Sequence, residues 1–519
     1  MTRVGVQARA GTGFADFSPL AHVVAKLRHK TLERQDAQRM QAGLLRSLIR
    51  RARNTAFGTA HGFEKIACVE DYQRAVPVRD YDAFWNEWWQ ASYPRLENVS
   101  WPGRIPYFAL SSGTTTGRSK HIPYTSEMRR AAVRGFLDLL ACHLVRHPES
   151  RLLGGAVLGL TGPTALQSPD AGVNAGAVSA ITADAVPRHL RNRILPPAEL
   201  ANCNDWQEKI HRLAPLALQT DLRMLGGSPN WMLIFLSEVE RQFGKYGGTL
   251  ADWFPNLELI VHGGVNFTPY REAFKTLLTG SLAETRELYS ASEGVFAYAD
   301  RDDGEGLRLH LNGSVFFEFI PLSDVDDTSP VRHWIANVET GVDYAVVVTT
   351  AAGLWSYLVG DVVRFVDVKP PRLLVTGRVS QGLSAFGEHL LESEIAAAVA
   401  KAAAAVKTHV VEYTVSAVRE ASGNRHKYFV ETNTPLYADA ERRFTDVVDA
   451  ALSEKNEDYQ ELRKNDLAIA APEVVFVTTG AFAAWMQSRR ALGGQNKVPR
   501  VVSDEDLFND MAGFLDSFT

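Results

Sequence analysis

The chemistry that this chain could perform is most concentrated in ten consecutive residues, which combine hydroxyl, glycine and basic side chains. Glycines let a backbone approach a ligand closely, and successive N–H groups in such a loop form a concavity that binds anions. The hydroxyls add donors and a lysine adds positive charge, so the segment suits a polyphosphate. A Ser/Thr/Gly-rich surface loop would have the same composition, and both interpretations stand at this point. The residues are Ser111, Ser112, Gly113, Thr114, Thr115, Thr116, Gly117, Arg118, Ser119 and Lys120.

This segment is not a Walker A loop, which places four residues between its glycines and continues with Gly-Lys-Ser/Thr. Gly113 and Gly117 are separated by three residues, and Gly117 is followed by Arg118. Taken alone, the loop therefore indicates phosphate binding by its composition and not by a known motif.

Three further segments place polar groups where they could meet a ligand. In Tyr289-Ser290-Ala291-Ser292-Glu293-Gly294 the ring could stack on a base while Glu293 binds Mg²⁺, which takes few protein carboxylates and several phosphate oxygens. Asp361 follows Gly360 between two apolar runs, so it either caps a turn or accepts hydrogen bonds from ligand hydroxyls such as a ribose diol. Lys497 follows a glycine pair and could reach into a cleft. A core tyrosine, a solvated glutamate and an exposed lysine are the structural alternatives.

Length and composition limit the classes of protein. A chain of 519 residues predicts a large domain plus a smaller one. The net charge of −5 gives no broad basic character, so we expect no nucleic-acid partner. Cys68, Cys142 and Cys203 lie far apart and predict reduced thiols in a cytoplasmic protein. The sequence shows no signal peptide and no run of about 18 apolar residues, so we expect no membrane span.

The pattern of apolar residues predicts a mixed α/β or α+β architecture. Between residues 105 and 365, strand-like runs such as 257–261, 315–320 and 344–350 alternate with helical ones. A glycine-containing stretch at 377–387 follows the last of these strands, and a helix, a strand pair and another helix are expected beyond it. We therefore predict a large domain over residues 1–380 and a small α+β domain over residues 381–519.

Together and in this order, the segments resemble those of the auxin-responsive acyl-acid amido synthetases, the Gretchen Hagen family. That family belongs to the acyl-adenylate-forming superfamily with the luciferase-like fold. The resemblance runs from about residue 30 to the C-terminus, and the ordered set is specific where any single member is not. Besides residues 111–120, the matching segments are Asn-Thr-Ala-Phe-Gly-Thr-Ala-His-Gly-Phe at 54–63, Val-Pro-Val-Arg-Asp-Tyr at 76–81, residues 353–363, residues 456–463, and Lys-Val-Pro-Arg at 497–500.

The resemblance implies a site at the junction of a large N-terminal domain with β-sheets and a smaller mobile C-terminal domain. The C-terminal domain would bring in the catalytic lysine. The implied roles are ATP phosphate binding by Ser111 to Gly117 with Lys120, adenine stacking by Tyr289 beside Ser290, close approach to the adenine by Gly263 and Gly264, Mg²⁺ ligation by Glu293, acceptance of the ribose hydroxyls by Asp361 with Arg378 nearby, and contact with the reacting carboxylate and α-phosphate by Lys497.

The implied reaction is the ATP-dependent joining of a carboxylic acid to an amine. The carboxylate attacks the α-phosphate and expels pyrophosphate, a step that needs in-line positioning and charge neutralisation more than an acid or base. An amine, usually that of an amino acid, then attacks the acyl-adenylate and AMP leaves, with domain rotation between the steps. A thiol acceptor, such as coenzyme A or a carrier protein, and a degenerate nucleotide-binding regulatory protein remain as alternatives.

Three positions depart from the family pattern. Ser356 and Leu358 replace arginines that flank Tyr357 in many members, and His389 replaces the lysine of a Gly-Glu-Lys segment. Histidine is uncharged much of the time near neutral pH, and fewer positive charges beside a polyphosphate would weaken charge-assisted hydrogen bonds. We therefore expect these replacements to affect efficiency, nucleotide preference or the second half-reaction.

The sequence names neither the acid nor the oligomeric state. The acyl pocket is expected between residues 160 and 235, where Trp231, Met232 and Phe235 would suit an aromatic or lipophilic acid. Packing of an ordinary core helix explains the same three residues equally well.

Overall fold

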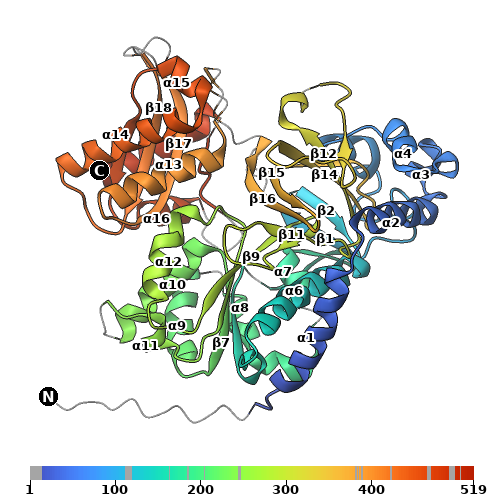
Figure 1. Cartoon of the computed structure of the whole chain (residues 1–519), viewed down its shortest axis with the longest axis horizontal. Helices are drawn as coiled ribbons and strands as arrows, with labels where there is room; N and C mark the ends of the chain where they lie inside the picture. Colours follow the sequence, from blue (N-terminus) through green and yellow to red (C-terminus); the bar gives the residue numbers. More distant parts are fainter. Residues whose placement is uncertain are drawn as a thin grey trace.

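The computed structural model describes residues 14–519 except 112–119, 163, 184–185, 204, 244–246, 326, 380–382, 384, 387, 389, 421–422, 464–468, 490–496 and 503. Figure 1 shows a large N-terminal part, in which helices flank sheets, and a smaller C-terminal part drawn in orange and red. Among the helices of the described residues, none combines the length and the apolar character needed to cross a membrane.

The large part is built on a sheet of twelve strands, and the direction of strand pairing changes at β9. On one side of β9 the neighbours are parallel, and on the other side they are antiparallel. The strand order is β13-β12-β14-β15-β16-β11-β10-β9-β8-β7-β3-β6. The strands are β3 (Ala156–Leu160), β6 (Ile194–Leu195), β7 (Leu222–Gly227), β8 (Leu259–His262), β9 (Glu284–Ala291), β10 (Gly294–Tyr298), β11 (Leu307–Leu309), β12 (Val315–Pro321), β13 (His333–Trp334), β14 (Asp343–Thr350), β15 (Tyr357–Val368) and β16 (Pro371–Arg378).

The strands form where the sequence is continuously apolar, because their side chains are covered on both faces. In β8 every residue of Leu-Ile-Val-His is buried, and in β12 six of the seven residues are buried. The strands expected at 257–261, 315–320 and 344–350 correspond to β8, β12 and β14.

A second sheet of four strands, in the order β2-β1-β5-β4, lies beside the first. Strands β1 (Tyr107–Ser111) and β2 (Lys120–Tyr124) are antiparallel neighbours, so Ser111 and Lys120 lie opposite each other. Strands β4 (Gln167–Asp170) and β5 (Val173–Gly176) complete the sheet. The hydroxyl- and glycine-rich segment therefore connects two paired strands, although residues 112–119 lie outside the described residues.

Helices pack against the sheets of the N-terminal part, and side-chain contacts hold two of them in place. Helix α2 (Ala37–Ala52) is fixed to β12 by Gln41, whose amide donates to Val315 O at 3.0 Å and accepts from Phe317 N at 2.9 Å. Helix α1 (Ser18–Glu33) is joined to α6 (Ser126–Arg146) by Arg28 and Asp138, with N–O distances of 2.6 and 2.8 Å. The remaining helices here are α3 (Ala56–Ala60), α4 (Val69–Ala75), α5 (Tyr81–Phe84), α7 (Val178–Ala183), α8 (Ala198–Ala201), α9 (Trp206–Leu218), α10 (Pro229–Phe243), α11 (Leu250–Trp253) and α12 (Arg271–Leu277).

Trp231, Met232 and Phe235 of α10 are buried in a hydrophobic core that α9 and α10 share with strands β3, β7 and β8. Trp231 packs edge-on against Trp206, with ring centroids 4.7 Å apart. These contacts are those of ordinary core packing, which was the structural alternative to an acyl pocket.

The C-terminal part has its own three-stranded sheet and its own core. Strands β17 (Val410–Glu420) and β18 (Gly423–Thr432) are antiparallel, and β19 (Glu473–Val477) is parallel to β18. The helices are α13 (Glu392–Ala405), α14 (Ala438–Lys455), α15 (Glu457–Arg463), α16 (Ala481–Ser488) and α17 (Glu505–Leu515). Residues such as Val399, Tyr428 and Leu452 form a core separate from that of the sheet of twelve.

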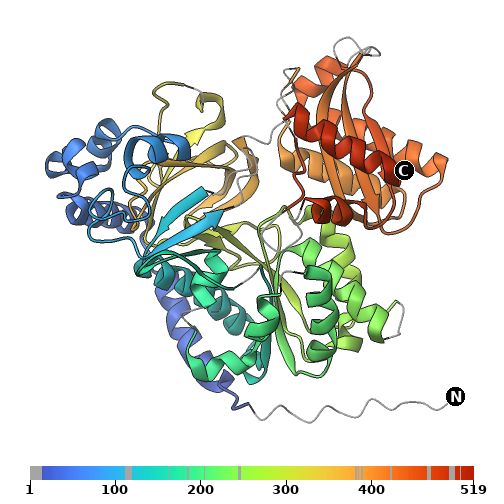
Figure 2. The same ribbon diagram turned by 180° about the vertical axis from the view of Figure 1, so that it is seen from behind.

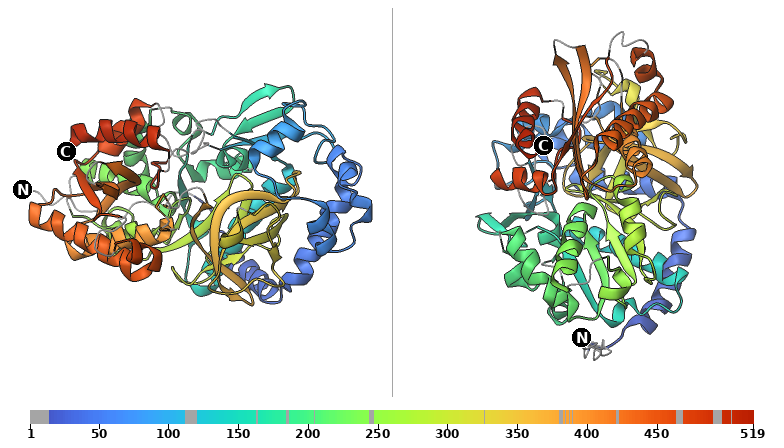
Figure 3. Two further views of the ribbon diagram at one scale, coloured as in Figure 1. Left: turned by 90° about the horizontal axis from the view of Figure 1, so that it is seen from above. Right: turned by 90° about the vertical axis from the view of Figure 1, so that its left-hand side faces the viewer.

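Figures 2 and 3 show the C-terminal part seated over the helices that follow β8 and beside the ends of β15 and β16. The predicted fold class is confirmed, since the chain is a mixed α/β protein with a large N-terminal and a smaller C-terminal domain. The exact boundary at residues 380 and 381 stays a prediction.

Candidate active site

Tyr289, Asp361 and Arg378 come from three strands of the large sheet and form one polar group, in which Tyr289 is buried and the other two residues are half-buried. Tyr289 ends the buried part of β9, and its hydroxyl donates to Asp361 Oδ2 at 2.8 Å. Arg378 of β16 lies opposite Asp361 of β15 in the antiparallel register, with its Nε 3.0 Å from Asp361 Oδ1. A carboxylate offers about four acceptor positions. Asp361 therefore keeps capacity for further donors, such as ligand hydroxyls.

Arg378 is itself incompletely paired. Its Nε forms the ion pair with Asp361, but among the described residues this buried nitrogen has no well-directed hydrogen-bond acceptor. Its Nη2 donates to Val359 O at a long 3.4 Å. Buried polar groups normally find partners, so an unsatisfied guanidinium nitrogen at this place suits a site that receives a polar ligand.

The local backbone explains how Asp361 reaches this position. Gly360 has φ of 90°, a conformation that favours glycine. The pairing of β15 with β16 also shifts register just beyond, between Val362 and Val363. Such bulges bend a strand and redirect a side chain, and they are common next to active sites.

Glu293 lies in the turn between β9 and β10 and is only 8% exposed. Burial raises the pKa of its carboxyl, with a further contribution from Asp361, and the positive charges of Arg378 and Lys120 oppose that rise. Burial, followed by the charge of Glu293, raises the pKa of Tyr357 on β15 well above its ordinary value. Glu293 is thus a desolvated carboxyl close to two cationic side chains.

Lys497 comes from the C-terminal domain and contacts the N-terminal one. Although the residue as a whole is exposed, its Nζ donates to Gly264 O, in the loop that follows β8. Desolvation lowers the pKa of Lys497, and Arg378 adds to this effect while Asp361 and Glu392 oppose it. These charge interactions place the lysine within electrostatic reach of the Asp361 group.

The two glycines after β8 permit this close approach. Gly264 has φ of 83°, and a Cβ there would lie 3.0 Å from Lys497 Nζ. A Cβ at Gly263 would overlap the carbonyl oxygen of Leu288 in β9. Larger residues at either position would push apart the strand ends or displace the lysine.

The remaining predicted site residues fall into two groups. Lys120 begins β2, with its Nζ 5.5 Å from the centre of the Tyr81 ring, and Ser290 is exposed on β9 beside the buried Tyr289. Ser111 ends β1. Predictions that lie outside the described residues are Ser112, Gly113, Thr114, Thr115, Thr116 and Gly117.

Ser356 and Leu358, the two neighbours of Tyr357, are held by contacts with other strands and loops. Ser356 is fully buried, where its hydroxyl donates to Glu318 Oε2 at 2.9 Å and accepts from Arg332 Nη1 at 2.9 Å. Leu358 packs into a small apolar cluster with Ile320 of β12. These side chains have partners other than those of Tyr357, and the effect of replacing arginine at the two positions stays a prediction. His389 lies outside the described residues.

Sequence reasoning missed three residues here, Tyr357, Glu392 and Arg500. Tyr357 and Arg500 were quoted within matching segments but given no role. Glu392 begins α13 and approaches Gly377, where a Cβ would lie 3.4 Å from that of Glu392. Its only sequence signal is its place shortly after the predicted boundary. Arg500 stands three residues after Lys497, and its signal was the Lys-Val-Pro-Arg segment.

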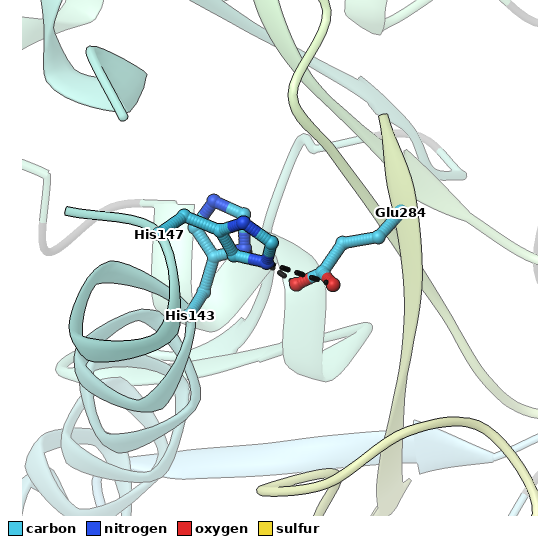
Figure 4. A group of neighbouring side chains, drawn as sticks. All are labelled: His143, His147 and Glu284. Atoms are coloured by element: carbon cyan, nitrogen blue, oxygen red, sulfur yellow. Dashed lines mark hydrogen bonds and ion pairs between the residues drawn. The ribbon is translucent and has the colours of Figure 1, made fainter. Parts of the chain in front are cut away.

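A second cluster of potential metal ligands lies elsewhere on β9. Figure 4 shows His143 and His147, one turn apart on and just beyond α6, directed at Glu284. Their nitrogens lie 2.6 and 3.0 Å from the two carboxylate oxygens. Arg286 also donates to both oxygens at 2.8 Å. Both carboxylate oxygens therefore already have two partners each, and the cluster is an ion-pair network joining α6 to the sheet.

This fold is shared with solved structures of two other proteins, both of which are named as enzymes that join an acyl group to a second substrate. Over 98% of both chains, it matches the GH3.15 acyl acid amido synthetase with a TM-score of 0.78 at 17% identity. It also matches 2-hydroxyisobutyryl-CoA ligase in complex with 2-HIB-AMP, with a TM-score of 0.62 at 15% identity over 92% of this chain and 91% of the other.

The family is established by sequence. Models of the GH3 family N-terminal, central and C-terminal domains match residues 27–228, 308–378 and 393–506. The chain belongs to the GH3 family, and the predicted resemblance is confirmed.

Curated relatives include indole-3-acetic acid-amido synthetase GH3.8 of Oryza sativa subsp. indica, 30% identical over 53% of this chain and 48% of the relative. Another is indole-3-acetic acid-amido synthetase GH3.3 of Arabidopsis thaliana, 27% identical over 59% of this chain and 53% of the relative. The chain spans about half the length of the curated relatives it matches.

Proposed function

We propose that this protein is an ATP-dependent acyl-acid amido synthetase, a ligase that adenylates a carboxylic acid and transfers the acyl group to the amine of an amino acid. The observation that carries the proposal is the convergence of Tyr289, Asp361, Arg378 and Glu293 with Lys497 of the other domain. Its relatives are named as amido synthetases, which favours an amine over a thiol as the acceptor.

The nucleotide would be held by the large domain, residues 1–380. Asp361 would accept the ribose hydroxyls while Arg378 balances its charge, and Tyr289 would pack on the adenine beside Gly263 and Gly264. The segment from Ser111 to Gly117 and Lys120 would bind the phosphates. Each of these roles is consistent with the side-chain positions given above, or with the strands that flank the segment.

Glu293 would be the protein ligand of Mg²⁺. A magnesium ion that accompanies ATP takes only one or two protein carboxylates. The raised pKa of Glu293 comes first from burial, a cost that a bound cation would offset, so the residue fits this role. When bound, the ion would neutralise phosphate charge.

Lys497 would act in the first step, on a small domain, residues 381–519, that moves between steps. Among the described residues its ammonium hydrogen-bonds to the carbonyl of Gly264, and it is partly desolvated. An anionic carboxylate or α-phosphate would be a stronger partner than Gly264 O, because charge-assisted hydrogen bonds are about twice as strong as neutral ones.

The three free cysteines are consistent with a cytoplasmic location.

The test is pyrophosphate release from ATP and Mg²⁺ with a panel of carboxylic acids, followed by mass spectrometry after adding amino acids or coenzyme A. Acid-dependent release followed by an amide product supports the proposal. A thioester with no amide would assign the thiol-dependent alternative, and ATP binding with no release for any acid would assign a non-catalytic nucleotide-binding role.

A further inference from the structure

Arg500 is a buried cation at the contact between the two domains. Only 5% of it is exposed. Its Nε donates to Glu412 Oε1 at 3.1 Å, within the C-terminal domain. Its other nitrogens donate across the contact, Nη2 to the Tyr270 hydroxyl and Nη1 to Asn266 O at 3.3 Å. One side chain thus satisfies partners in both domains.

Aromatic rings from both domains enclose the same guanidinium. Its carbon lies 5.0 Å from the centre of the Tyr270 ring and 5.1 Å from that of Tyr413. The Tyr270 hydroxyl also reaches Glu412 Oε2 at 3.4 Å. A buried charge is tolerated only when it is paired and hydrogen-bonded. The contact with Tyr270 therefore supplies some of the hydrogen bonds that the buried Arg500–Glu412 pair needs.

The backbone around Arg500 is firmly attached to β17. Arg500 O accepts from Val415 N at 2.8 Å, and Val502 N donates to Val415 O at 2.9 Å. The Thr414 hydroxyl donates to Pro499 O at 2.7 Å. This segment cannot shift along the domain without breaking several hydrogen bonds, so the place of Lys497, three residues earlier, depends on how the domain docks.

The two side chains meet the same loop of the N-terminal domain. Lys497 donates to Gly264 O and Arg500 to Asn266 O, two residues further on. A lysine at position 500 could pair with Glu412. It would lack the planar guanidinium, which donates to three partners at once and stacks on aromatic rings. The arrangement therefore depends on arginine at this position.

We propose that Arg500 is a positioning residue: by docking between Tyr270 and Tyr413 it selects the domain arrangement in which Lys497 reaches the loop after β8. The docking itself is independent of the chemistry, whereas its consequence for acid adenylation rests on the proposed function. If the C-terminal domain rotates for the second step, the hydrogen bonds from Arg500 to Tyr270 and Asn266 must break first.

The first experiment measures docking without any reaction. Tyr270→Phe keeps the ring and removes the hydroxyl that receives Arg500. Lysine labelling with an amine-reactive reagent, read by mass spectrometry, should show several-fold faster modification of Lys497 in this variant. Lys401, exposed and paired with Glu454 at 2.6 Å, serves as the internal reference. Unchanged labelling of Lys497 would overturn the proposal, even if the protein proved to have no ligase activity.

The second experiment separates positioning from general stability. Tyr270→Phe should slow acid-dependent pyrophosphate release about tenfold, the size expected for one lost hydrogen bond to a charged group. Aminolysis of a chemically prepared acyl-adenylate should change less than twofold. Tyr428→Phe is the matched control, since that buried hydroxyl has no hydrogen-bond partner among the described residues, and it should affect neither step. Equal slowing of both half-reactions by Tyr270→Phe would contradict a positioning role, as would no slowing of the first.

Discussion

Strand β9 carries a charged group near each end, and the two groups differ in how completely they are paired. At its start, Glu284 receives four hydrogen bonds or ion pairs from His143, His147 and Arg286. Just past its end, Glu293 is a desolvated carboxyl. Lys497 of the C-terminal domain belongs to the same group, and its ammonium donates to the carbonyl oxygen of Gly264. The first group has charged partners for each carboxylate oxygen within the protein, whereas the second has fewer among the described residues, which is consistent with the ligand site proposed above.

The pKa directions of the two carboxyls express the same difference. Burial opposes ionisation of Glu284, but hydrogen bonds from His143 and Arg286 outweigh it and hold the pKa well below its usual range. For Glu293, burial dominates and raises the pKa. Perturbation of this second kind is common at functional sites, and the first kind is typical of structural ion-pair networks.

The largest effect that would separate the two groups is expected at Lys497. Lys497→Ala should lower acid-dependent pyrophosphate release by about 10²–10³-fold, because it removes charge stabilisation where negative charge develops. The midpoint of urea unfolding should stay unchanged, since the ammonium contacts a single carbonyl. Lys401→Ala is the control for a lost surface charge, and a similar loss of activity in it would argue against a specific role.

The opposite pattern is expected at Glu284. Glu284→Ala removes the carboxylate that Arg286, which is 1% exposed, pairs with at 2.8 Å and leaves Asp302 at 3.7 Å as its carboxylate partner. Breaking such a buried pair costs about 3 kcal/mol. Urea unfolding of the N-terminal domain should show that loss. Pyrophosphate release per folded molecule should remain near that of the wild type. A variant that unfolds normally yet fails to release pyrophosphate would mean that the two ends of β9 are functionally coupled.

A smaller effect on binding is expected at Asp361. Asp361→Asn keeps the shape of the side chain but removes the charge that pairs with Arg378. Affinity for ATP, measured by calorimetry, should fall about tenfold, as expected for hydrogen bonds to a charged acceptor. Asp343→Asn, in an ion pair with Arg364 on the neighbouring strands, is the matched control. Equal losses in both variants would remove Asp361 from the nucleotide site.

The smallest effect concerns Glu287, which lies between the two groups on β9. Burial, followed by repulsion from Asp303, raises its pKa to about 7 from the ordinary 4.5. Since the folded state holds this proton more tightly, its contribution to stability is complete below pH 4.5 and is lost as pH rises through 7. Glu287→Gln should therefore stabilise the protein at pH 8 by roughly 2 kcal/mol and flatten the decline in stability between pH 4.5 and 7. A pH profile of unfolding identical to that of the wild type would refute this assignment.

Much of the architecture was predictable from local patterns. Runs such as Val-Phe-Phe-Glu-Phe-Ile at 315–320 are β-branched or aromatic at every position except Glu318, so they indicate buried strands. The motif order identified the family because each segment can be recognised without knowing its neighbours in space. Tyr289, Asp361 and Arg378 were named in this way, and the structure brings them together.

Other features could not be predicted, because they depend on contacts between residues far apart in the chain. Ser356 looked like a lost charge beside a phosphate, yet it completes a buried network with Glu318 and Arg332. Trp231 was assigned to the region of the acyl pocket from its residue type, and only the structure shows that it packs against Trp206. In each case the residue type was clear and the direction of its side chain was not.

The sequence by itself determined which segments form strands, which family the chain belongs to and which residues are candidates for the site, since these follow from residue types and their order. Only the tertiary structure decided which charges are satisfied. Glu284 is paired by helix α6, and Arg500 is paired by Tyr270 of the other domain, more than 200 residues away. The physical reason is that the energy of a buried charge depends on the groups around it, and folding selects those groups from distant parts of the chain.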